Sequence, residues 1–137
     1  MVERINKKEG KLLARDEFRR ALDELKGAKI LQENELYFKS VASSYYSVYH
    51  AAKAVLLLKG VIPKSHEGVA RMFSLYYVKT GEIEIDTGKI IGRLTKLREE
   101  ADYYPESVFR LKDAQEALEM AKTFVENIQK KLGRLLT

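Results

Sequence analysis

The C-terminal segment carries an apolar repeat that limits the chain to helical packing. Its apolar residues follow one another at alternating spacings of three and four: Leu111, Ala114, Leu118, Ala121, Val125, Ile128, Leu132 and Leu135. A sustained period of about 3.5 residues is typical of helices that pack in bundles or coiled coils. We therefore expect this segment to form one long helix whose apolar stripe faces other helices.

Helical periodicity also runs through the rest of the chain and predicts four more helices. These span residues 11–33, 35–59, 65–79 and about 87–102. The two prolines, Pro63 and Pro105, lie where the periodicity breaks. Residues 82–86 alternate like a strand, but no second strand is predicted for them to pair with, so we expect a connecting loop. Short connections between five helices imply an all-α, antiparallel bundle.

The core face of the first helix and two helix ends can also be assigned. The apolar positions of the first helix are Leu12, Leu13, Phe18, Leu22, Leu25 and Ile30. Gly60 is placed to end the second helix, because glycine readily adopts the left-handed conformation found there. Ser65 is placed to cap the third helix, because a serine hydroxyl can accept a hydrogen bond from a free backbone N–H group.

The composition favours one domain, 1–137, and excludes several kinds of site. The 137 residues are 45% hydrophobic, which is enough for a core. The absence of cysteine excludes disulfides and thiolate metal sites. The two histidines lack acidic partners at metal-binding spacing, and the sequence has no glycine-rich phosphate loop. We therefore expect neither a metal nor a cofactor.

Hydropathy and charge bear on location and partners. The longest apolar run, residues 54–58, is too short to cross a membrane, and the first eight residues carry no secretory signal. This predicts a cytoplasmic protein without membrane contact. The net charge of +5 permits a polyanionic partner, although basic and acidic residues are interspersed throughout. Abundant lysine and glutamate are compatible with a thermophilic source.

The end of the fourth predicted helix gathers a cation, a carboxylate and two phenols. Arg98 and Asp102 are four residues apart, so their side chains are neighbours on one helix surface. Tyr103, Tyr104 and Pro105 follow at once, and the proline ends the helix. One interpretation is an exposed ion pair that contributes little to stability. The other is a pocket for phosphoryl groups, in which the guanidinium binds phosphate oxygens.

A second group of aromatic and polar residues lies in the second predicted helix. Tyr46 and His50 are one turn apart on one face, and Tyr45 and Tyr49 share the adjacent face. They form either a packed seam between core and solvent or a stacking surface for a base or phosphate. His66 begins the third predicted helix, whose free N–H groups favour anions. It is either a solvent-facing or packed side chain, or a phosphate-contacting or proton-transfer group.

Three stretches together resemble a HEPN domain (higher eukaryotes and prokaryotes nucleotide-binding) of the small stand-alone prokaryotic kind. They are the tyrosine-rich 44–60, the segment 64–69 and the helix end 94–103, and the resemblance runs across about residues 11–131. It implies an all-α bundle that pairs as a homodimer. It also implies a small nucleotidyltransferase-like protein as partner, in a toxin–antitoxin-type pair.

The resemblance also bears on catalysis, because many HEPN domains are metal-independent endoribonucleases. Their motif consists of an arginine, a polar residue and a histidine a few positions later. Arg98 and Glu99 match its opening, but residues 103–105 stand where the histidine would fall. Asp102 and Tyr103 instead resemble the Arg…Asp-Tyr ending of a HEPN subgroup. Proton transfer works best with groups whose pKa lies near the operating pH, and tyrosine and arginine are poorly matched to that task.

Three functions fit these residues. The first is a dimeric module that binds nucleotide or RNA phosphate through Arg98, Asp102, Tyr103, Tyr46, Tyr49 and His50. The second is an endoribonuclease that uses Arg98 with His50 or His66, provided that the fold brings a histidine beside the guanidinium. The third is a structural dimerisation module without a ligand. The missing motif histidine favours binding over catalysis. In a dimer, we expect the fourth helix, its end and the second helix to meet the symmetry mate.

Overall fold

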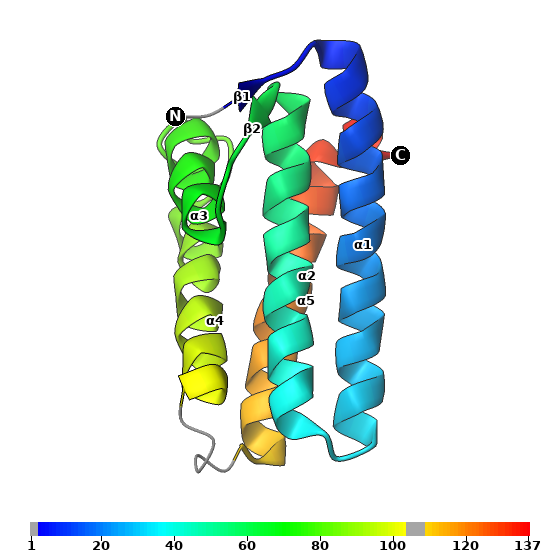
Figure 1. The fold of residues 1–137 in the computed structure, drawn as a ribbon, viewed down its shortest axis with the longest axis vertical. Helices are drawn as coiled ribbons and strands as arrows, with labels where there is room; N and C mark the ends of the chain where they lie inside the picture. Colours follow the sequence, from blue (N-terminus) through cyan, green and yellow to red (C-terminus); the bar gives the residue numbers. More distant parts are fainter. Residues whose placement is uncertain (1–2, 104–108) are drawn as a thin grey trace.

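The computed structural model describes residues 3–103 and 109–137 and confirms the all-α antiparallel bundle (Figure 1). Within these ranges the elements are β1 (Glu3–Arg4), α1 (Lys7–Glu33), α2 (Tyr37–Leu58), β2 (Val61–Ile62), α3 (His66–Phe73), the π-helical turn η1 (Ser74–Val78), α4 (Ile85–Tyr103) and α5 (Leu111–Leu136). Their ends differ from the predicted ones by a few residues. None of the helices in the described part of the chain is long and apolar enough to span a bilayer.

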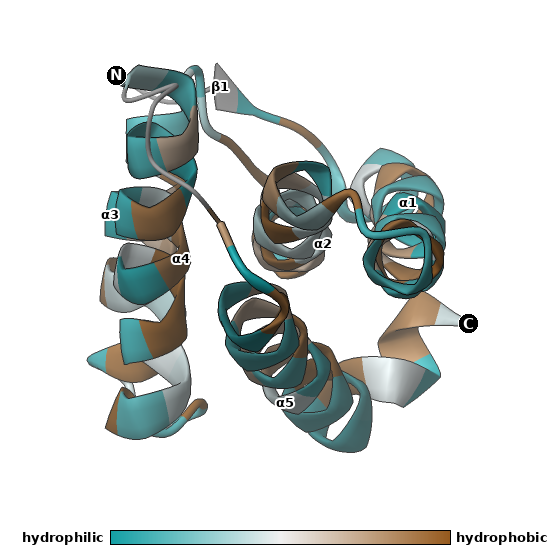
Figure 2. Ribbon diagram, turned by 90° about the horizontal axis from the view of Figure 1, so that it is seen from below, coloured by the Kyte–Doolittle hydropathy of each residue, from teal (hydrophilic) through white to brown (hydrophobic). Residues whose placement is uncertain are grey.

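Helix α2 lies at the centre of the bundle. It contacts α1, α3, α4 and α5, and Figure 2 shows it with α1 on one side and α3 and α4 on the other. Its buried residues cover a wide arc of the helix, whereas Tyr46, Tyr49, His50 and Lys53 are only partly buried. Side chains of α2 can therefore meet groups that come from distant parts of the sequence.

The core-facing stripe of α1 differs from the predicted one. Leu12, Leu13, Leu22 and Ile30 are between 40% and 57% exposed, so their assignment to the core was wrong. The buried residues of α1 are mostly small: Gly10, Ala14, Glu17, Phe18, Ala21 and Ala28. Small side chains face α2 because they let the two helix backbones approach closely, and this close packing decides which stripe is buried.

The close approach of α1 and α2 shows in contacts toward both ends of the pair. A Cβ atom on Gly10 would lie 2.3 Å from the backbone oxygen of Leu57. The Ser40 hydroxyl donates a hydrogen bond of 2.7 Å to the carbonyl oxygen of Ala28. Between these two points Glu17, in the middle of α1, is held against the middle of α2.

The predicted apolar repeat forms α5 and is confirmed over most of its length. Five of its members are buried: Ala114, Leu118, Ala121, Val125 and Ile128. The terminal members Leu111 and Leu135 are exposed, whereas Leu136, which is not part of the repeat, is buried at the end of the helix. Phe124, which is not part of the repeat, is also fully buried and packs 5.3 Å from the ring of Phe73.

Two helix ends follow the predicted chemistry, and one prediction between them was wrong. Gly60, which follows the C-cap residue Lys59 of α2, has a φ of 75°, and the Gly68 N–H donates to the Ser65 hydroxyl at the start of α3. Residues 61–62 lie in the connection between the second and third predicted helices, where no strand is predicted, but they pair as β2 with β1, with Ile62 opposite Glu3. Residues 82–84 connect η1 to α4 as expected, whereas α4 begins at Ile85 and so takes in the last two residues of the predicted loop.

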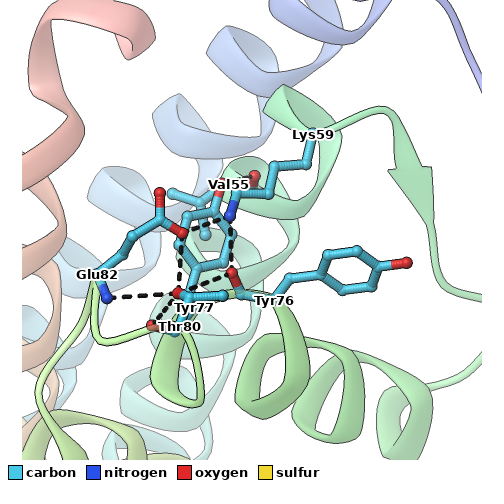
Figure 3. Close-up of polar contacts among 6 residues, drawn as sticks. All are labelled: Val55, Lys59, Tyr76, Tyr77, Thr80 and Glu82. Carbon is cyan, nitrogen blue, oxygen red and sulfur yellow. Dashed lines mark hydrogen bonds and ion pairs between the residues drawn. The ribbon is translucent and has the colours of Figure 1, made fainter.

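Polar contacts hold the irregular turn η1 against the end of α2 (Figure 3). The Lys59 ammonium donates to the carbonyl oxygen of Tyr76 at 2.7 Å and pairs with the Glu82 carboxylate. The Tyr77 hydroxyl donates to the carbonyl oxygen of Val55, and burial raises the pKa of this hydroxyl, so it stays protonated. These contacts order the segment that leads into α4.

Candidate functional site

Arg98, near the end of α4, lies against aromatic side chains of α2. Its Cζ atom is 5.2 Å from the ring centre of Tyr45 and 5.3 Å from that of Tyr46, within the range of cation–π attraction. Its Nη2 atom is 3.4 Å from Oδ2 of Asp102, so the ion pair expected from their spacing is present. The Arg98 side chain is 29% exposed. The guanidinium is therefore held in place and still reaches solvent.

Among the described residues, the phenols that lie against Arg98 come from α2, whereas the sequence predicts Tyr103 and Tyr104 beside it. Tyr103 is 75% exposed, and Tyr104 lies outside the described residues. The rings under the guanidinium belong to Tyr45 and Tyr46, about fifty positions earlier in the chain. A spacing argument along one helix could not find them, because the contact depends on how α2 and α4 pack.

Five rings from two elements form one aromatic cluster, which consists of Tyr45, Tyr46, Tyr49, His50 and His66. The His66 ring stacks on Tyr49 with ring centres 4.1 Å apart and planes 12° apart. Tyr46 stands edge-on to Tyr45, Tyr49 and His66. The structure thus brings together two groups that the sequence presents separately, the tyrosines of α2 and the histidine at the start of α3.

Tyr45 connects the aromatic cluster to His66 by a hydrogen bond as well as by ring contact. Its hydroxyl oxygen is 2.8 Å from Nδ1 of His66. Burial raises the pKa of Tyr45 to about 12, against the opposing effect of the Arg98 charge, so the hydroxyl keeps its proton. Burial and the Arg98 charge both lower the pKa of His66, which is therefore neutral at neutral pH.

His50 has a different partner, the carboxylate of Glu17 on α1. Nδ1 of His50 is 2.7 Å from Oε2 of Glu17, while Lys53 and Arg20 lie 3.8 Å and 3.5 Å from Oε1. Burial acts to raise the pKa of the Glu17 carboxyl, but the hydrogen bond with His50 and the charge of Lys53 outweigh it and lower the pKa. Glu17 is therefore ionised at neutral pH, although it is only 8% exposed.

Two members of this arrangement were missing from the predicted site, Tyr45 and Glu17. Tyr45 was noted on the face next to Tyr46 but was not assigned to the ligand. For Glu17 the available signal was an acidic residue at a position flanked by Ala14, Phe18 and Ala21, all of which face the core. The sequence prediction assigned the leucines of α1 to the core. That assignment placed Glu17 outside the predicted core face, so its burial was not expected.

The arrangement offers a cation, hydrogen-bonding nitrogens and ring faces within a small volume. An arginine can bind two oxygens of a phosphate at once, and aromatic rings can stack on a nucleobase. Among the residues that the structure describes, no group of three or more His, Cys, Asp or Glu side chains is placed to hold a metal ion. The described geometry therefore fits an anionic, partly aromatic ligand.

The proximity of Arg98 and His66 predicts a measurable coupling. The positive charge of Arg98 disfavours the imidazolium form, so Arg98→Ala should raise the pKa of His66 from its lowered value toward the ordinary 6.5. An NMR pH titration of the His66 ring protons in wild type and variant measures this. Arg93→Ala, which removes an exposed arginine where α4 faces α5, should leave the pKa unchanged. An unchanged pKa in Arg98→Ala would contradict the geometry.

Comparisons with known proteins agree with this architecture. A family model described as the HEPN domain matches residues 14–132. "Putative toxin MJ0605" of Methanocaldococcus jannaschii is 43% identical over 116 residues, which cover 85% of this chain and 86% of that protein. "Putative toxin MJ0142" of the same organism is 31% identical over 79% of this chain and 74% of its own length. A "UPF0332 protein" of Thermotoga maritima is 32% identical over 82% of this chain and 85% of its own.

Proposed function

The chain belongs to the HEPN domain family, and on this premise we propose that it binds the phosphate of a nucleotide or of RNA at Arg98. The observation that carries the proposal is the position of this guanidinium and its exposure to solvent. It lies over two tyrosine rings, which fix its position, and its side chain is still 29% exposed. Its carboxylate partner, Asp102, is itself half exposed and can give way to a competing anion.

The rings around Arg98 supply the second part of the recognition. Tyr46 and Tyr49 are partly exposed and His66 is exposed, so a base next to the bound phosphate can reach an aromatic face. Stacking of this kind contributes about 1–3 kcal/mol per base and tolerates different bases. The site should therefore bind single-stranded RNA or nucleotides with little sequence preference.

The proposal extends to the biological setting. The names of two relatives in M. jannaschii contain the word toxin, and this supports a role in a toxin–antitoxin-type module. We propose a nucleotidyltransferase-like partner on the family resemblance alone. We further propose a homodimer in which α4, its end and α2 meet a second copy, so that two Arg98 side chains enter one cleft. Light scattering after size exclusion should give a dimer at micromolar concentration, and a monomer would refute this part.

A second candidate function is metal-independent RNA cleavage with Arg98 and a histidine. The observation that favours it is that both histidines border the Tyr46 ring on which Arg98 lies, with ring centres at 6.5 Å for His50 and 6.0 Å for His66. Cleavage would persist in EDTA and disappear in Arg98→Ala and in one histidine variant. If the RNA stays intact at high protein concentration, cleavage is refuted and binding is the function that remains.

The binding proposal predicts that Arg98→Ala weakens RNA binding about tenfold or more, because a hydrogen bond to a charged group is worth about 1.5–3 kcal/mol. Fluorescence anisotropy with a labelled, 5′-phosphorylated single-stranded RNA in EDTA measures the affinity. Arg93→Ala is the matched control, since it removes the same charge from another face of α4. Equal affinity of wild type and Arg98→Ala would remove Arg98 from the site.

A further inference from the structure

The two histidines of the aromatic cluster use the same ring nitrogen for contacts of opposite character. Nδ1 of His50 meets the carboxylate of Glu17 at 2.7 Å. Nδ1 of His66 meets the hydroxyl of Tyr45 at 2.8 Å. In a neutral imidazole one nitrogen carries the proton and the other accepts, so each contact determines what Nε2 can do.

For His50 the partner requires a proton on Nδ1. An ionised carboxylate only accepts hydrogen bonds, and Lys53 and Arg20 beside Glu17 favour its ionised form. His50 therefore donates from Nδ1, and in the neutral ring Nε2 is left with a lone pair. The carboxylate is buried between α1 and α2, so this arrangement is built into the packing of the two helices.

For His66 the partner favours the reverse arrangement. The protonated phenol of Tyr45 is a much stronger acid than a neutral imidazole N–H group, so the stronger hydrogen bond has the hydroxyl donating to Nδ1. The proton of His66 then sits on Nε2, which becomes a donor. The aromatic cluster thus combines an acceptor nitrogen on His50 with a donor nitrogen on His66.

We propose that Glu17 is a positioning residue that presents Nε2 of His50 as an acceptor for a ligand hydroxyl next to the phosphate bound by Arg98. The proposal is motivated by a shared neighbour: the ring centre of His50 is 6.5 Å from that of Tyr46, and Cζ of Arg98 is 5.3 Å from the same ring centre. In this arrangement Arg98 binds phosphate oxygens, His66 donates a hydrogen bond to the ligand, and His50 accepts one from a ligand hydroxyl. The inference rests on the phosphate site proposed above and adds a specificity to it.

The ligand hydroxyl that fits is the ribose 2′-hydroxyl. It is the group by which a protein distinguishes RNA from DNA at a given site, and as a donor it needs an acceptor in the protein. An arginine alone would bind the phosphates of RNA and DNA alike. A nitrogen that accepts from the 2′-hydroxyl contributes one neutral hydrogen bond, which corresponds to a preference for RNA of about three- to tenfold.

The test compares RNA and DNA oligonucleotides of the same sequence, both 5′-phosphorylated, by anisotropy in EDTA. Wild type should bind the RNA about three- to tenfold more tightly. Glu17→Gln should reduce this ratio toward one, because a neutral amide can accept from Nδ1–H or donate to Nδ1 and no longer fixes the tautomer. Glu82→Gln makes the same change at the Lys59 ion pair, outside the aromatic cluster, and should keep the wild-type ratio.

Nitrogen-15 NMR of the histidine rings reports which ring nitrogen carries the proton. This protonation pattern would not change if Glu17 had a purely structural role. Wild type should show His50 protonated on Nδ1 and His66 protonated on Nε2, and Glu17→Gln should change only the His50 signals. His50→Phe keeps an aromatic ring but removes Nε2, so it should lower the ratio of RNA affinity to DNA affinity toward one.

The outcomes distinguish this inference from the phosphate site itself. A wild-type ratio of one, or an Nε2–H tautomer of His50, would overturn the role of Glu17 and His50 while the loss of binding in Arg98→Ala still stands. If Arg98→Ala binds as well as wild type, the phosphate site is wrong, whatever the ratio.

Discussion

Replacing Tyr45 by alanine is expected to lower the free energy of unfolding by about 3–5 kcal/mol. The Tyr45 ring is only 3% exposed, and it carries the Arg98 guanidinium on its face and the His66 ring beside it. Alanine would leave a cavity between α2 and α4 and remove the platform of the cation. Tyr45→Ala should therefore lower both the free energy of unfolding and the affinity for RNA.

Tyr45→Phe separates the ring from the hydroxyl. It keeps the packing and the cation–π contact but removes the hydrogen bond to His66, so it should cost only about 1 kcal/mol. Urea unfolding followed by circular dichroism measures both variants. If Tyr45→Phe were as unstable as Tyr45→Ala, the hydroxyl rather than the ring would hold the aromatic cluster together, and the packing argument would be wrong.

Gly10→Ala is expected to destabilise the fold by about 3 kcal/mol, because overpacking at this point meets backbone rather than a flexible side chain. The new Cβ atom would lie 2.3 Å from the carbonyl oxygen of Leu57, so α1 and the end of α2 would have to separate. That separation would also move α1, and Glu17 with it, relative to His50.

Gly27→Ala is the matched control within the same helix. A Cβ atom at this position would have no neighbouring atom within 4 Å, so alanine should stabilise the protein by about 0.5–1 kcal/mol through its higher helix propensity. Thermal and urea unfolding of the two variants give the comparison. Equal stability of Gly10→Ala and Gly27→Ala would contradict the close contact of α1 and α2.

The sequence predicts the bundle well where large apolar residues decide the packing. The repeat of α5 needs only its own spacing, and five of its members are buried. In α1 the same rule fails, because glycine and alanine give α2 a closer approach than Leu12 or Leu22 would allow. The short β1–β2 pair also escapes prediction, since it joins two residues at the N-terminus to two that follow Gly60.

In the candidate site, the sequence predicts the contact within one helix but not the contacts between helices. The pair of Arg98 and Asp102 lies within one helix turn, and its spacing alone predicts the contact. The contacts of Arg98 with Tyr45 and of His50 with Glu17 join different helices. Periodicity determines which face of a helix a residue occupies but not which neighbour that face meets. The tertiary contacts of the site therefore had to come from the structure.

The central claim is that phosphate binds at Arg98 beside the aromatic cluster. The most direct measurement is NMR of protein with nitrogen-15 in its arginine and histidine side chains, titrated with a short 5′-phosphorylated single-stranded RNA. The Nε signal of Arg98 and the ring nitrogens of His66 should shift together and saturate at the same RNA concentration, while Arg93 stays unchanged. Saturable binding that leaves the Arg98 and His66 signals in place would contradict the claim.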